Sequence, residues 1–71
     1  MIVDVRSQLA QVPFVPFLIR TSDGHQDVVP TVDHAYITPH GKRVVVATDG
    51  DVLAILSPLH ISAVTVQLSD G

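Results

Sequence analysis

The sequence predicts one small all-β domain with a short helix at its N-terminus. Its 71 residues allow a single domain at most, and the 46% that are hydrophobic are mainly aliphatic, which favours β packing. Asp23-Gly24 and Asp49-Gly50 each separate two strand-like runs. Asp-Gly is a strong hairpin signal, because a two-residue type I′ turn needs positive φ at both central positions. We therefore expect about five antiparallel strands in a strongly bent sheet or small barrel.

Residues 4–11 predict the helix. Asp4 suits the N-cap or the first turn, where a negative charge is favourable, and Val5, Leu9 and Val12 recur near one face at helical spacing. Pro13 ends the pattern, since the residue before a proline avoids helical dihedrals. Two turns are not stable alone in water, so we expect this helix to cover one end of the β structure.

The strand-like segments combine β-branched or alternating apolar residues with flanking turn residues. They are residues 14–22, 25–29, 35–38, 43–48, 51–56 and 61–66. The first is cleanest from Phe17, because Pro16 cannot donate to a sheet and marks its beginning. The unbroken apolar run of residues 43–48 indicates burial on both faces.

The sequence also predicts the loops and turns that connect these strands. Residues 30–34 are expected to form a loop and residues 39–42 a turn. Pro58-Leu59-His60 indicates a single 3₁₀ turn before the last strand. In that strand the alternation leaves open whether Ile61 and Ala63, or Ser62 and Val64, face the core.

Charge and composition limit the partners. The net charge is −3 with four Lys and Arg residues, which argues against a large contact with phosphates. No cysteine is present, no apolar run is long enough to span a bilayer, and the first residues lack a signal-peptide pattern. We expect a cytoplasmic protein with no membrane partner. Its aliphatic content on a minimal domain predicts a homo-oligomer.

Four histidines are the main candidates for chemistry: His25, His34, His40 and His60. Their spacing matches no local metal motif, so we assign no metal site. His25 and His40 are expected at the surface beside turns. His34 follows Asp33, the closest pairing of acid and imidazole, and His60 is expected to be partly buried and hydrogen-bonded.

Other motifs point to turns and not to catalysis. Asp49-Gly50-Asp51 is too short of oxygen ligands for a calcium loop, and the chain contains no Glu. There is no Gly-x-Ser-x-Gly elbow and no phosphate-binding glycine loop. A barrel of this size fills its interior with side chains, so we expect no enzyme and no cofactor.

The order of the motifs resembles a family of small uncharacterised bacterial proteins of about this length. The likeness covers residues 12–66 and consists of turns, strand cores and a Pro-Phe segment, so it implies a fold and no activity. The motifs are Pro13-Phe14, Phe17, Ser22-Asp23-Gly24, Val29-Pro30, Gly41 to Val46, Asp49-Gly50 and Leu59-His60-Ile61.

A helix followed by five strands is also similar to the Sm-like and SH3-like small barrels, among them the bacterial RNA chaperone Hfq. In the Sm-like family a 3₁₀ turn separates the last two strands, and edge strands pair between subunits into rings. His60-Ile61-Ser62 resembles the histidine-containing stretch at that place in Hfq. Pro58 and Leu59 stand where that family has basic and aromatic residues.

The leading hypothesis is a non-catalytic binding or assembly module that self-associates through strand edges. The first alternative is an Sm-like RNA-binding protein that uses His60, Lys42 and Arg43. The second is a histidine-based protein that binds a metal or a small ligand. The candidate binding residues are His34, Lys42, Arg43 and His60.

Overall fold

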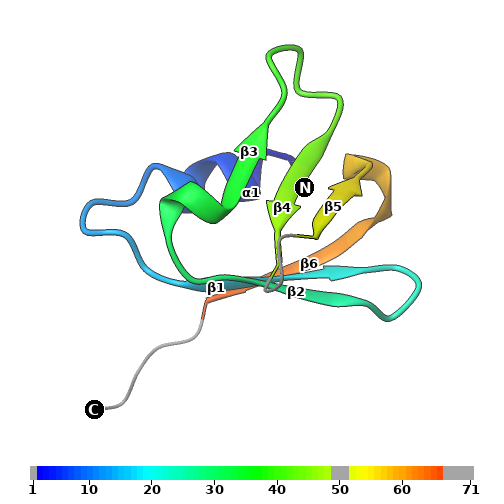
Figure 1. Ribbon diagram of the computed structural model, residues 1–71, viewed down its shortest axis with the longest axis horizontal. Helices are drawn as coiled ribbons and strands as arrows, with labels where there is room; N and C mark the ends of the chain where they lie inside the picture. Colours follow the sequence, from blue (N-terminus) through cyan, green and yellow to red (C-terminus); the bar gives the residue numbers. More distant parts are fainter. Residues whose placement is uncertain (1, 49–51, 67–71) are drawn as a thin grey trace.

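The computed structural model describes residues 2–48 and 52–66, and strands make up most of its regular secondary structure (Figure 1). Within these residues no helix is long and apolar enough to cross a membrane. The elements in chain order are α1 (Ile2–Leu9), β1 (Phe17–Thr21), β2 (Gln26–Val29), the 3₁₀ turn η1 (Val32–His34), β3 (Ala35–Ile37), β4 (Val44–Ala47), β5 (Leu53–Leu56), the 3₁₀ turn η2 (Pro58–His60) and β6 (Ile61–Val66).

The strands form two three-stranded antiparallel sheets. Sheet A has the order β2-β1-β6, and sheet B has the order β3-β4-β5. In the described residues no strand of one sheet pairs with a strand of the other, so the expected five-stranded barrel is wrong: there are six strands and no closure. Pro30 and η1 give the physical reason, because a proline and a 3₁₀ turn interrupt the backbone between β2 and β3.

The core lies between the inward faces of the two sheets. Sheet A contributes Phe17 and Ile19 from β1, and sheet B contributes Val44 and Val46 from β4, all of them at most 1% exposed. Val5 of α1 is fully buried in the same cluster. The helix therefore docks on the β structure, as its length required.

The helix differs from its prediction at both ends. It begins at Ile2, so Asp4 lies in the first turn and is not the N-cap. It ends at Leu9, and Val12 is 93% exposed instead of continuing the apolar face. Pro13 restricts Val12 to extended dihedrals and so keeps that residue out of the helix.

Burial on both faces of β4 was also a wrong expectation. Val44 and Val46 are buried, whereas Val45 and Ala47 are only half-buried on the opposite face. The register places Tyr36 and Ile55 on either side of Val45, so neighbouring side chains shield this outer face only in part.

A β-bulge explains why the alternation in β6 was ambiguous. Thr21 pairs with Ile61, whereas Arg20 pairs with Ala63, so Ser62 is an extra residue in β6. The inserted residue reverses the alternation, and Ile61 and Val64 both pack on the core. The Ser62 hydroxyl donates to the Arg20 carbonyl across the bulge, at 3.2 Å.

The first hairpin turn is longer than predicted. The Thr21 N–H donates to the His25 carbonyl, which leaves a three-residue loop that ends at Gly24 with φ +90°. The turn at residues 39–42 is confirmed, with Gly41 at φ +69° and its N–H on the Thr38 carbonyl. The Asp49-Gly50 turn and Asp51, together with the polar tail of residues 67–71, lie outside the described residues.

Candidate functional site

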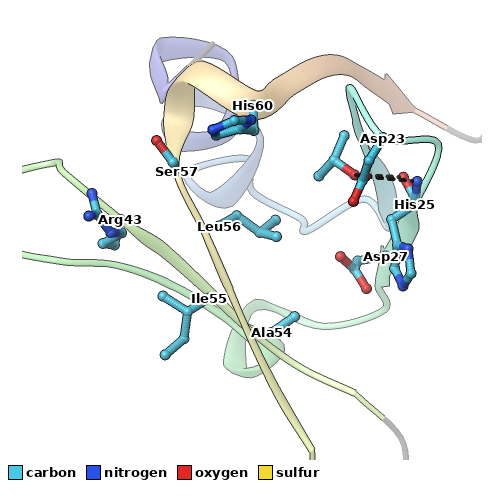
Figure 2. Close-up of a pocket in the computed structure, with 10 residues that line it drawn as sticks. Asp23, His25, Asp27, Arg43, Ala54, Ile55, Leu56, Ser57 and His60 are labelled. Atoms are coloured by element: carbon cyan, nitrogen blue, oxygen red, sulfur yellow. Dashed lines mark hydrogen bonds between the residues drawn. The ribbon is translucent and has the colours of Figure 1, made fainter.

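A cleft of about 620 Å³ separates the β1–β2 hairpin from β5 (Figure 2). β2 and β5 are each at the edge of their sheet, so the cleft lies where the two sheets are not joined. The hairpin wall carries Asp23, His25 and Asp27, and the opposite wall carries Ala54, Ile55 and Leu56 of β5. One wall is therefore acidic and the other apolar.

Asp27 is the most unusual residue of the cleft. Strand alternation turns its side chain inward, on the same face as Val29 and opposite Ile19 of β1. Its side chain is 8% exposed, and Oδ2 is buried with no hydrogen-bond partner. A buried carboxyl without a partner costs free energy, because it loses its hydration and gains nothing in return.

The tip of the hairpin is fixed by the Asp23 carboxylate. The Thr21 hydroxyl donates to Asp23 Oδ1, and the His25 N–H reaches the same oxygen at 3.3 Å. These two hydrogen bonds, the Thr21 hydroxyl first, hold the pKa of Asp23 below its ordinary value. Asp23 therefore keeps a negative charge at the mouth of the cleft at neutral pH.

His60 closes one end of the cleft through its backbone. Its N–H donates to the Ser57 carbonyl at 2.9 Å, and its carbonyl accepts from the Ser22 N–H at 2.7 Å. The second hydrogen bond joins η2 to the first hairpin. The His60 side chain is exposed, so the expectation of a partly buried, hydrogen-bonded histidine is wrong. Within the described residues, the hydrogen bonds of His60 are made by its backbone and not by its imidazole.

Among the described residues that line this cleft, Arg43 is the one Lys or Arg. It lies just before β4, and its Nη1 donates to the Lys42 carbonyl at 2.7 Å. The guanidinium is thereby held at the turn. Figure 2 shows Arg43 on the far side of β5 from the acidic hairpin, so it does not neutralise Asp27.

A second cavity, of about 610 Å³, contains His34. His34 is half-buried, and its Nδ1 lies 2.7 Å from the Thr31 hydroxyl. Asp27 lines this cavity as well as the cleft. The Asp27 side chain therefore stands between two hollows along the free edge of β2.

Of the four predicted binding residues, the structure therefore places only two at the same cavity. His60 and Arg43 share the cleft, Lys42 lies exposed in the β3–β4 turn, and His34 lies at the second cavity. His25 and His40 are exposed, as expected. In residues 2–48 and 52–66 no three His or Asp side chains are placed to hold a metal ion, so histidine-based metal binding gains no support.

Asp27 was not among the predicted site residues, although a signal for it existed. Within the run of residues 25–29 it has the same parity as Val29, and an acidic residue at an inward position of a strand is unusual. Strand parity would have identified it once the strand was aligned with β1.

Comparisons with known proteins give no further identification. No protein-family model, curated protein or solved structure matches this chain. Over residues 2–48 and 52–66 the fold consists of one short helix and two three-stranded antiparallel sheets, with an open cleft between two sheet edges.

Proposed function

We propose that the chain is a cytoplasmic, non-catalytic assembly module that self-associates through the free edge of β5 and the apolar surface beside it. The observation that carries this proposal is a continuous set of apolar side chains on the outward face of sheet B. We call it the outer patch, and its members are Tyr36, Val45, Ala47, Leu53 and Ile55.

The register makes the outer patch continuous. Tyr36 pairs with Val45, and Val45 pairs with Ile55, so three side chains form one row across the sheet. Ala47 and Leu53 form the next row. Leu53 is 61% exposed and Ile55 is 65% exposed. Apolar surface of this kind usually marks a contact with another molecule.

The strand at the border of the patch supports a specific way of binding. β5 pairs with β4 on one side, and no strand of the described residues pairs with its other side, so that side offers backbone groups to a further strand. A second copy can add its own β5 there in antiparallel orientation, which generates a two-fold symmetric pair. The exposed Leu53 and Ile55 side chains would then meet their counterparts.

Light scattering coupled to size-exclusion chromatography tests the proposal. At tens of micromolar we expect a mass that is a multiple of the 7.6 kDa chain. Ile55→Lys places a charge in the patch and should give the single-chain mass. Val28→Lys is the matched control, because Val28 is an exposed apolar residue on the other edge strand, β2. A wild-type protein of single-chain mass would refute self-association.

RNA binding is the second candidate, and the shared position of His60 and Arg43 at the cleft favours it. We expect it to be weak, since Asp23 and Asp27 line the same cleft and repel phosphates. Fluorescence anisotropy with a single-stranded oligonucleotide, followed over a range of salt concentrations, is the test. Arg43→Ala should flatten the salt dependence, and absence of binding at low salt removes the candidate.

A further inference from the structure

We propose that the cleft between the β1–β2 hairpin and β5 binds an organic cation that carries N–H donors on an aliphatic stem, with Asp27 as its anchor. Alkylammonium groups, including lysine side chains, belong to this class. The inference concerns the cleft, which shares Ile55 and the edge of β5 with the proposed assembly surface, but its argument does not rest on self-association.

The anchor is a carboxyl oxygen of Asp27 for which the described residues provide no hydrogen-bond partner. Asp27 Oδ2 has no hydrogen-bond donor, and no ion pair to this carboxyl lies within the described chain. Figure 2 shows the carboxyl directed from β2 toward the middle of the cleft. An ammonium ligand would provide both a hydrogen-bond donor and a positive charge to this buried carboxyl group.

The opposite wall suits an aliphatic stem. Leu56 points across the cleft toward Asp27 (Figure 2). Ala54 lies two residues before Leu56 in β5 and therefore on the same inward face of the strand. Both side chains are half-buried, so contact with a stem removes apolar surface from water on both molecules. The volume of about 620 Å³ lies within the range of small-ligand sites.

The charges select a cation over an anion. Asp23 and Asp27 both lie on the hairpin wall, and the hydrogen bonds to Asp23 keep it ionised. Arg43, on the far side of β5, donates to the Lys42 carbonyl and does not face these carboxyls. His25 and His60 are exposed at the margin of the cleft. An anion would therefore meet Asp23 at the mouth of the cleft and Asp27 farther in.

Chemical-shift mapping on the ¹⁵N-labelled full chain tests the site with n-butylammonium chloride as the probe. We expect saturable shifts at Asp27, Leu56 and His60. n-Butanol has the stem without the charge and should give none of these shifts. n-Butyltrimethylammonium has the charge without an N–H donor and should bind about tenfold more weakly, which corresponds to one lost charged hydrogen bond.

Asp27→Asn should weaken n-butylammonium binding by about tenfold or more, whereas Asp33→Asn, an exposed acid outside the cleft, should leave it unchanged. The wild-type mapping does not depend on how the variants fold. Equal shifts from the wild type and Asp27→Asn, or no saturable shift in the wild type, would overturn the proposal and leave Asp27 as a charge that protects an edge strand.

The same samples, measured by light scattering, separate this proposal from the proposed function. Saturable ammonium binding to a protein of single-chain mass supports the cleft and refutes the assembly. Because a strand added to the free edge of β5 would border this cleft, an oligomer is diluted until its mass is that of a single chain before the titration. Absence of ammonium binding under that condition refutes the cleft and leaves the assembly supported.

Discussion

β2 and β5 are both edge strands that border the same cleft, yet their side chains differ in kind. The side chain of Asp27 in β2 points inward. A charge at that position disfavours the pairing of a further strand with the free edge of sheet A. β5 directs Ala54 and Leu56 inward and exposes Leu53 and Ile55, with no charge in the strand. An inward charge is a known protection against edge pairing, so the comparison predicts that new strands add at β5 and not at β2.

The largest expected effect is a difference in stability loss between a substitution in the core and one on the outer patch. Phe17→Ala removes a side chain that is 1% exposed in the core and should cost about 3–5 kcal/mol, a large part of the stability of so small a domain. Tyr36→Ala on the outer patch should cost less than about 1 kcal/mol in a single chain. Urea denaturation measures both, and equal losses would contradict the assignment of inner and outer faces.

Asp27→Val makes the inward face of β2 resemble that of β5. Replacing an unpartnered buried carboxyl by an apolar side chain should raise the free energy of unfolding by about 1–3 kcal/mol. The same change removes the protection of the β2 edge, so larger assemblies should form in light scattering. A loss of stability would show that Asp27 has a stabilising partner in solution.

The two glycine turns allow a smaller comparison. Gly24→Ala, at φ +90°, should cost about 1 kcal/mol or more, because a Cβ is strained there even though nothing lies within 4 Å of it. Gly41→Ala, at φ +69°, lies closer to the left-handed region that other residues visit, and its Cβ would lie 3.6 Å from Arg6. We expect a smaller loss there. Thermal denaturation of the two variants side by side provides the measurement.

The smallest effect concerns the pH response of the first hairpin. The pKa of Asp23 is lowered in the folded chain, so the stabilisation is present above the ordinary value of 3.8 and is lost as the pH falls through the folded value. Thr21→Val removes the leading hydrogen bond and should move this pKa back toward 3.8. NMR titration of the Asp23 carboxyl follows the change, and an unaltered pKa would assign the shift to the backbone of His25 instead.

Local patterns in the sequence were sufficient for several elements. β6 has the predicted bounds, and η2 occurs at Pro58-Leu59-His60, because a proline turn followed by a β-branched run leaves few alternatives. Two features depend on tertiary structure and could not be predicted in the same way. The bulge at Ser62 depends on how β6 meets Arg20 and Thr21 across the sheet, and the separation into two sheets depends on the path from Pro30 to His34.

The candidate site was predicted less well than the strands. Sequence reasoning selected His34, Lys42, Arg43 and His60 because of their residue types, and the structure distributes them over two cavities and a turn. Asp27 was missed because an acidic residue in a short polar strand looks like a surface residue. Its burial becomes evident only when β2 is aligned with Ile19 of β1.

The position of β1 has a consequence for the order in which the chain folds. β1 pairs with its hairpin neighbour β2 and also with β6, where Phe17 lies opposite Val66. The β1–β2 hairpin can form early, since its closing loop is short, but the pairing of β1 with β6 must wait until residues 61–66 are available. During synthesis, one side of β1 therefore stays without its β6 partner until β6 has left the ribosome.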